Sequence, residues 1–345
     1  MIAPRWLPLA VALSSGALAT GACYDNSPVP TQQEAGPYVP PPVTPVVPRV
    51  DEPYAPPVGM AFVVDTGAIP GGRLLFPLGD DPFMGTYRVY SMRPDGTELT
   101  PVTPKDEYAW APAWSPGDSL IAYGLATYWN EVIEVVRPDG SGRRRVADDG
   151  TYPFWLPDGR IGFSCLEGIC TVDASGANRT VLLTLANDHD FGYTYSPDGS
   201  MIAFVRLIEN ESHSYVIAQP SNVYVMRRDG TDLHRITTTD SVSTYEYAPS
   251  WSREGRQLAF LSWTYGVAVA DADGGRLHGI SHSPPSKGLG LSGPAWSPDG
   301  TQVLFSDDAG RMYIANADGS GMIRRVAPPF DQGNAPWGAF SWSAR

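Results

Sequence analysis

The sequence predicts an all-β protein, a six-bladed β-propeller whose blades are four-stranded antiparallel sheets. Three observations support this fold class. A Trp-Ser-Pro-Asp-Gly motif recurs every 40 to 56 residues, a second Asp-Gly motif alternates with it, and each end of the chain carries part of one repeat. The 36 glycines and 34 prolines among 345 residues favour many turns over long helices.

The first motif places an aromatic residue before a tight turn and a short apolar run. In Ser-Pro-Asp-Gly, Pro presets φ at the first corner and Gly takes the left-handed position that closes the turn. We expect each aromatic ring to fill the wedge between two neighbouring sheets. The rings are 41, 40, 56 and 45 residues apart, and they are Trp114, Trp155, Tyr195, Trp251 and Trp296.

The second motif marks a hairpin that follows another apolar run. Short β-rich runs separated by Asp-Gly turns predict hairpins. Each period therefore holds four strands, which is typical of a propeller blade. The six copies of the motif lie at 93–103, 137–147, 173–183, 227–237, 271–281 and 316–327.

The two ends of the chain complement each other. Residues 72–76 (GRLLF) match the second strand of a repeat but have no Trp-Ser strand before them, and residues 340–343 (FSWS) supply such a strand 46 residues after Trp296. We expect the C-terminal strand to pair with the N-terminal blade, which completes the sixth blade and removes open sheet edges. Residues 60–64 (MAFVV) are expected to add a strand near this closing blade.

The first residues predict export. Residues 1–22 contain Arg5, an apolar run at 7–13 and then small residues, which is the layout of a secretory signal. Thr20-Gly21-Ala22-Cys23 resembles a bacterial lipobox, so we expect lipidation of Cys23; cleavage after Ala19 is the alternative.

The mature chain divides into a linker and one domain. Residues 23–58 begin with Cys23 and are rich in Pro, a composition that favours an extended polyproline II spacer. A Pro-rich ligand for a binding module is the alternative interpretation. Residues 59–345 contain the repeats and are the predicted propeller.

The repeat resembles that of a known family. Trp-Ser-Pro-Asp-Gly followed by Ile-Ala-Phe, then Tyr-Val-Met and Asp-Gly-Thr, is similar to the propeller repeat of the TolB family of periplasmic proteins, over about residues 60–345. The resemblance implies a propeller in the cell envelope. The sequence departs from TolB where a Pro-rich linker replaces the N-terminal α/β domain, so TolB's own partner contacts are not implied. The Gly-His and Trp-Asp pattern of Trp-Asp repeat proteins does not occur.

The sequence contains no motif to which a catalytic role is assigned. A prolyl-oligopeptidase-like hydrolase needs Gly-x-Ser-x-Gly, which the sequence lacks. The Gly-x-Gly-x-x-Gly match at 288–293 has no helix after it, and Asp271-Ala272-Asp273-Gly274 lacks the distant Glu of a calcium loop. The densest group of potential metal ligands is Asn187-Asp188-His189-Asp190; we expect a polar loop, and a metal site there remains the alternative. We therefore predict no catalytic residue, metal or cofactor.

Cys165 and Cys170 flank a predicted hairpin turn. Facing positions of a hairpin lie within disulfide range, and an exported protein meets an oxidising compartment. We expect a disulfide between these two residues.

The predicted function is a non-catalytic binding scaffold, periplasmic or anchored at the outer membrane. The net charge of −13 argues against nucleic acid, and aromatic loops on one propeller face favour a protein, peptide or peptidoglycan-associated partner. Burial of about half of these rings between blades is the alternative. A metal-dependent lyase or lactonase acting on a carbohydrate or lactone is the alternative function. The expected partner-binding residues are Tyr108, Trp110, Tyr128, Trp129, His189, Tyr245, Tyr247 and Trp337.

Overall fold

The protein is all-β over the residues that the structure describes. The computed structural model describes residues 71–81, 86–127, 130–184, 190–208, 220–238, 246–281, 293–307, 311–321, 324–326 and 339–344. Every helix or strand in these ranges is a β-strand, and within them no helix is long and apolar enough to cross a membrane. The predicted signal, linker and extra strand (1–22, 23–58 and 60–64) lie outside the described residues.

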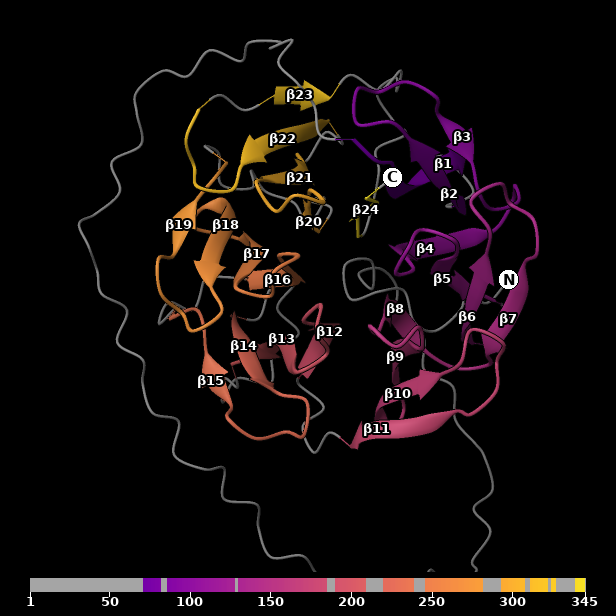
Figure 1. Cartoon of the computed structure of the whole chain (residues 1–345), viewed down its shortest axis with the longest axis horizontal. Coiled ribbons are helices and arrows are strands. Elements are labelled where there is room, and N and C mark those ends of the chain that lie inside the picture. The colour runs from indigo at the N-terminus through magenta and orange to yellow at the C-terminus, as the bar shows by residue number, and fades with distance from the viewer. Residues whose placement is uncertain are drawn as a thin grey trace, which may run out of the picture.

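Four sheets contain four antiparallel strands each, joined in sequence order (Figure 1). The first is β8 (Thr151–Trp155), β9 (Ile161–Cys165), β10 (Gly168–Val172) and β11 (Thr180–Thr184). The second is β12 (Asp190–Tyr195), β13 (Met201–Leu207), β14 (Ser221–Arg227) and β15 (His234–Arg235). The third is β16 (Glu246–Trp251), β17 (Gln257–Ser262), β18 (Gly266–Asp271) and β19 (His278–Gly279), and the fourth is β20 (Ala295–Trp296), β21 (Gln302–Ser306), β22 (Met312–Asn316) and β23 (Arg324–Val326).

The other eight strands form one longer sheet. They are β1 (Leu74–Asp81), β2 (Thr86–Met92), β3 (Thr100–Pro101), β4 (Tyr108–Trp114), β5 (Ile121–Ala126), β6 (Glu131–Val136), β7 (Arg144–Ala147) and β24 (Ser341–Trp342). One antiparallel run is β24-β1-β2-β3 and the other is β4-β5-β6-β7. The two runs meet at a single parallel bridge, Tyr87 opposite Tyr108.

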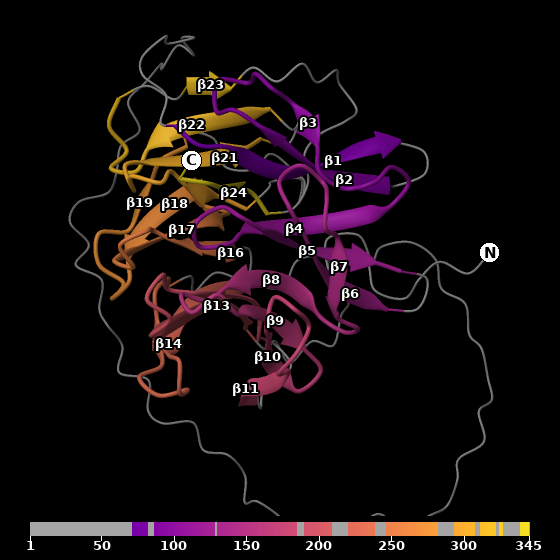
Figure 2. The same ribbon diagram turned by 45° about the vertical axis from the view of Figure 1, so that its right-hand side comes forward.

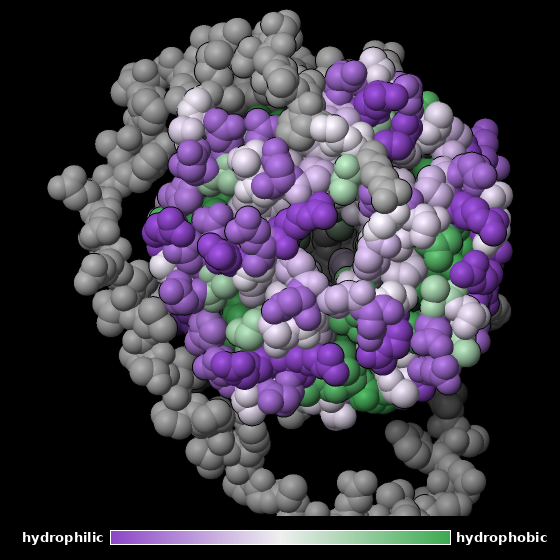
Figure 3. Space-filling view, viewed as in Figure 1, coloured by the Kyte–Doolittle hydropathy of each residue, from purple (hydrophilic) through white to green (hydrophobic). Residues whose placement is uncertain are grey.

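The sheets stand around a central opening, which is the arrangement of a β-propeller (Figure 1). The strands nearest the opening are β4, β8, β12, β16, β20 and β24, and we call them the inner strands. Figure 2 shows the same sheets as separate twisted layers. In the space-filling view the opening is a hollow in a largely hydrophilic face (Figure 3). The prediction of an all-β protein built from four-stranded antiparallel sheets is confirmed.

The hydrophobic core is divided among the gaps between neighbouring sheets. Ile133 of β6 and Phe163 of β9 share one buried cluster, and Val223 of β14 and Phe260 of β17 share another. Each middle strand is thus covered on both faces, which explains why these strands read as continuous apolar runs in the sequence.

A repeated hydrogen bond joins neighbouring inner strands. The indole N–H of a tryptophan in one inner strand donates to a backbone carbonyl in the preceding inner strand. The accepting carbonyl always belongs to the residue just before the motif aromatic of that preceding strand. The pairs are Trp155 and Ala113 (3.0 Å), Trp251 and Thr194 (3.2 Å), and Trp296 and Ser250 (3.0 Å). The bulky ring therefore fills the wedge and also supplies a partner for a backbone group in it.

The serine after the aromatic residue holds the turn between the first two strands of a sheet. The hydroxyl of Ser297 accepts a hydrogen bond from the backbone N–H of Gln302, five residues on (2.9 Å). The backbone N–H of Ser297 donates to the carbonyl of the same Gln302 (2.8 Å). Ser115, Ser196 and Ser252 repeat both contacts with Leu120, Met201 and Gln257.

Matched positions of three fourth strands make contacts at the outer rim. The side chain there reaches a carbonyl oxygen in the next sheet's hairpin turn. The pairs are Arg144 and Ala174 (2.8 Å), His234 and Ala272 (3.0 Å), and His278 and Ala317 (2.9 Å). Three pairs of neighbouring sheets are therefore joined by polar contacts at both their inner and outer edges.

The indole hydrogen bond predicts the effect of a conservative substitution. Trp296→Phe keeps an aromatic ring but leaves the carbonyl of Ser250 without its donor, so we expect the free energy of unfolding to fall by about 2 kcal/mol. Trp114→Phe, at the same motif position in β4, is the matched control and should lower it by less, because the indole N–H of Trp114 has no acceptor among the described residues. Urea unfolding measures both, and equal losses in the two variants would contradict this interpretation.

Candidate functional site

The inner strands all begin at one end of the sheets. Tyr108, the first residue of β4, lies opposite Ala126 at the end of β5, which lies opposite Glu131 at the start of β6. Glu246 at the start of β16 lies opposite Ser262 at the end of β17 in the same way. We call this end, with the hairpins that join the second and third strands, the loop face.

Three of the eight predicted partner-binding residues are described. Tyr108 and Tyr247 are half-buried, and their rings contact Tyr87 (centroids 5.1 Å apart) and Phe191 (6.3 Å). Trp110 is only 6% exposed, so it packs between sheets, as the alternative interpretation expected. Tyr128, Trp129, His189, Tyr245 and Trp337 lie outside the described residues.

Of the loop at 187–190, for which a metal site was the alternative interpretation, only Asp190 is among the described residues. Its side chain is 2% exposed, and both carboxylate oxygens accept hydrogen bonds from the guanidinium of Arg206 at 2.7 Å. That guanidinium also lies over the ring of Tyr224, 5.1 Å from its centroid. Asp190 is thus committed to a bidentate ion pair, while residues 187–189 lie outside the described residues.

Glu246 is a second deeply buried carboxyl group of the loop face. The residue is 2% exposed, and its Oε1 accepts a hydrogen bond from the Ser262 hydroxyl (3.1 Å). Its Oε2 has no partner among the described residues. Burial raises the pKa of this carboxyl to about 8, and the Ser262 hydrogen bond only partly offsets that effect. Glu246 therefore holds a proton at neutral pH.

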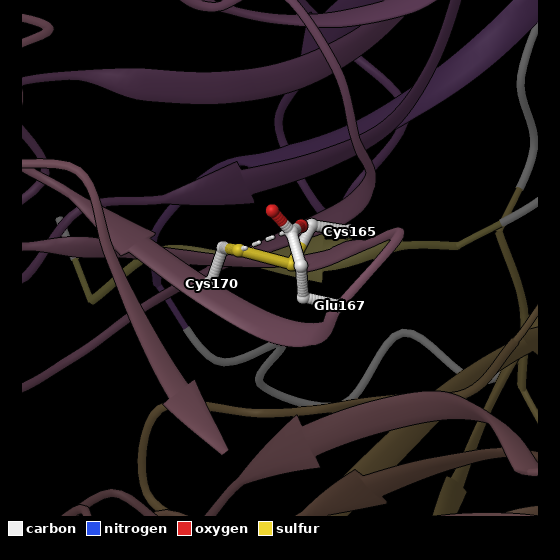
Figure 4. Close-up of side chains that lie close together, drawn as sticks. All are labelled: Cys165, Glu167 and Cys170. Atoms are coloured by element: carbon white, nitrogen blue, oxygen red, sulfur yellow. Dashed lines mark hydrogen bonds between the residues drawn. A yellow bond between two sulfur atoms is a disulfide. The ribbon is translucent and has the colours of Figure 1, made fainter. Parts of the chain in front are cut away.

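Cys165 and Cys170 are joined by a disulfide with a Cα–Cα distance of 5.8 Å (Figure 4). They do not face each other as the sequence argument assumed: Cys165 lies opposite Gly168, and Cys170 lies opposite Phe163. The bond is therefore diagonal across the hairpin, between positions on the same face of the sheet.

The disulfide hairpin projects from the loop face. At its tip Leu166 is 98% exposed, and the next residue, Glu167, forms an ion pair with Arg179 (3.3 Å). Cys165, Glu167 and Cys170 are the one group of three potential metal ligands in the described part of the chain. Because the disulfide occupies both sulfur atoms (Figure 4), no thiolate is present there to bind a cation.

Sequence reasoning missed a backbone feature that shapes the loop face. The residue three positions before the inner-strand aromatic has a left-handed φ in four inner strands: Ala111 (45°), Tyr152 (51°), Gly192 (66°) and Ala248 (50°). Each lies in a register shift, so a bulge bends every one of these strands at the loop face. A small residue three positions before the aromatic residue, as in three of the four strands, was the sequence signal that could have predicted this bulge. Tyr152 is large and does not fit that pattern.

Comparison with known proteins identifies the fold. No protein-family profile matches the chain, and no curated protein matches it. The fold is similar to that of TolB from Acinetobacter baumannii, with 19% identity and a TM-score of 0.57 over 79% of this chain and 66% of that chain. It is also similar to that of a putative TolB from Agrobacterium tumefaciens, with 17% identity and a TM-score of 0.52 over 80% of this chain and 99% of that one.

A puromycin hydrolase variant shares the fold as well, with 14% identity and a TM-score of 0.51 over 76% of this chain and 46% of that chain. The domain is therefore a β-propeller. More narrowly, its fold is TolB-like. Fold similarity does not assign an activity, because one fold hosts many functions.

The buried Glu246 predicts a pH dependence of stability. Because its pKa rises from about 4.5 unfolded to about 8 folded, its contribution is fully present below about pH 4.5 and is lost as the pH rises through about 8. Glu246→Gln should remove this loss and exceed the wild type by at least about 1 kcal/mol at pH 8.5. Thermal or urea unfolding between pH 4.5 and 8.5 measures it.

The exposed Glu254→Gln is the matched control, since Glu254 lies on the opposite end of the same sheet. Parallel pH profiles for wild type and Glu246→Gln would contradict the assignment.

Proposed function

We propose that this chain is a non-catalytic binding scaffold of the cell envelope: a closed six-bladed propeller, tethered through Cys23, that presents its loop face to a protein or peptidoglycan-associated partner. The observation that carries the proposal is the TolB-like propeller fold in a chain that begins with a secretory and lipobox-like segment. The localisation, the tether and the partner are parts of the proposal.

The blade count rests on how the long sheet divides. Its runs β24-β1-β2-β3 and β4-β5-β6-β7 share only the bridge between Tyr87 and Tyr108. Each run has the same strand order as the four separate sheets. If each run is one blade, the described strands make six blades of four.

Closure is supported by contacts that repeat those of an ordinary blade. The hydroxyl of Ser343 accepts a hydrogen bond from the backbone N–H of Arg73 (2.7 Å), and the backbone N–H of Ser343 donates to the carbonyl of Arg73 (2.9 Å). These are the two contacts that Ser297 makes with Gln302, here formed between opposite ends of the chain.

The packing between the first and the last sheet also supports closure of the ring. Strand β24 pairs with β1 and also contacts β20 and β4, its two neighbouring inner strands. One buried cluster contains Phe76 of β1 together with Leu304 of β21 and Ile314 of β22. The first and last sheets therefore share a core like those between the other neighbouring sheets.

A binding role accords with the state of two described carboxyl groups on the loop face. Asp190 is committed to Arg206, and Glu246 is buried against Ser262. A metal-dependent enzyme would need ligands from several blades converging on the opening. Metal analysis of the purified full chain tests that alternative: a stoichiometric, tightly bound divalent ion would overturn the scaffold proposal.

Partner binding predicts a crosslinking result. Leu166→Asp changes a fully exposed residue on the loop face and should abolish the specific crosslinked product in cell envelopes without affecting stability. Glu254→Lys, at an exposed turn on the opposite end, is the matched control and should retain the product. Loss of the product in both variants, or in neither, would count against the loop face.

The tether predicts lipid labelling. In bacterial cells fed with labelled palmitate, the wild-type chain should incorporate label and Cys23→Ala should not, because the acyl groups would be carried by that cysteine. Cys165→Ala with Cys170→Ala is the matched control and should remain labelled. An unchanged label in Cys23→Ala would refute the tether.

A further inference from the structure

A row of three facing residues lies at the loop-face end of one sheet. Tyr108, Ala126 and Glu131 are directly opposite one another on β4, β5 and β6, so their side chains project from the same face of the sheet. All three are partly exposed. Because Ala126 has only a methyl group, the space between the tyrosine ring and the carboxyl group is not filled by the strand that separates them.

Trp110 forms the floor beneath this row. It is two residues along β4 from Tyr108 and lies opposite Gly124. Its indole lies directly against that glycine, since a Cβ added to Gly124 would come within 2.9 Å of the ring. Trp110 is buried, and its Nε1 has no acceptor among the described residues. The row thus lies over an aromatic surface.

Tyr152 of the next sheet forms the facing wall. Its ring meets that of Trp110 edge to face, with centroids 4.6 Å apart. Tyr152 and Ala111 both have left-handed φ values, 51° and 45°. A tyrosine in this region is strained, by about 1–3 kcal/mol, and persists only where surrounding contacts hold it. The aromatic wall is therefore fixed in place.

The carboxyl group of Glu131 has no charged partner among the residues that the structure describes. The described residues give it no ion pair or hydrogen bond, and burial raises its pKa to about 7. Burial also raises the pKa of both Tyr108 and Tyr152 to about 12, and the nearby charge of Glu131 contributes to both. An ionised Glu131 is thus close to two tyrosines and lacks a compensating cation.

We propose that Tyr108, Glu131 and Tyr152 bind an organic cation above Trp110, namely the ammonium or guanidinium group of a lysine or arginine side chain on the partner. This rests on the proposed function and names the chemistry of its partner. A carboxylate supplies the opposite charge, and aromatic rings add cation–π attraction. An anion would be repelled, and an apolar group would cover the carboxyl without compensating its lost hydration. The chain's net charge of −13 favours the approach of a basic segment.

The test titrates the purified full-length protein with the peptide acetyl-Gly-Lys-Gly-amide and follows the indole signal of Trp110 by NMR. We expect saturable binding of this peptide and none of the same peptide with an acetylated lysine, which keeps the shape but lacks the charge. Glu131→Gln should weaken binding at least 10-fold. Ala126→Leu, which fills the space but keeps the carboxyl, should do the same.

Glu254→Gln, on the opposite end of the sheets, is the matched control and should bind like the wild type. Equal binding of the acetylated peptide, or unchanged binding by folded Glu131→Gln and Ala126→Leu, would overturn the proposal. The two proposals can fail separately. If the wild type forms the crosslinked product, Leu166→Asp loses it, and the wild type does not bind the lysine peptide, only the cation site is refuted. Lysine binding without any specific crosslink removes the scaffold role instead.

Discussion

The hydrogen bond from an inner-strand indole to the carbonyl of the preceding inner strand is the interaction on which the arrangement of the sheets depends. It recurs from Trp155, Trp251 and Trp296, and in each case one side chain both fills the wedge and satisfies a backbone group there. The turn serine fixes the next strand relative to that ring. Together these contacts join the inner strands of three pairs of neighbouring sheets and hold each following turn.

The properties of the loop face follow from this packing. Where an inner strand begins, a left-handed residue bends it, and the polar side chains before the bend are brought into the gap between sheets. Asp190 and Glu246 are each buried there, but with different outcomes: Asp190 meets Arg206, whereas Glu246 meets only the Ser262 hydroxyl and holds a proton. Glu131 remains partly exposed and without a partner among the described residues. Glu131 lies at the start of β6, not on an inner strand, so the bend accounts for the positions of Asp190 and Glu246 only. The loop face thus holds one ion pair, one neutral acid and one candidate recognition site.

The sequence predicted features that depend on local order and missed those that depend on neighbouring sheets. Turn chemistry placed the hairpins, because Pro, Asp and Gly act within four residues. The spacing of the two cysteines correctly predicted that they lie in one hairpin. The register between β9 and β10, which places Cys165 opposite Gly168, was not predicted. The burial of Trp110 and Glu246 could not be predicted from the alternation of residues along a strand. Alternation shows which side chains share a face of the sheet, but it does not show what packs against that face. Small residues at the left-handed positions could have predicted where the inner strands bulge, but Tyr152 occupies one of these positions with a large side chain.

We propose that strands β1 and β24, which pair with each other, close the ring through one shared blade. Native-state hydrogen exchange at the backbone amide of Ser343, two residues before the last residue of the sequence, tests it without altering the protein. A chain end that is not held exchanges almost as fast as an unfolded peptide. If Ser343 donates to the carbonyl of Arg73 within a closed blade, its amide will exchange as slowly as that of Ser297 in an internal blade. Exchange of Ser343 at the rate of an unprotected amide, with Ser297 still protected, would contradict closure.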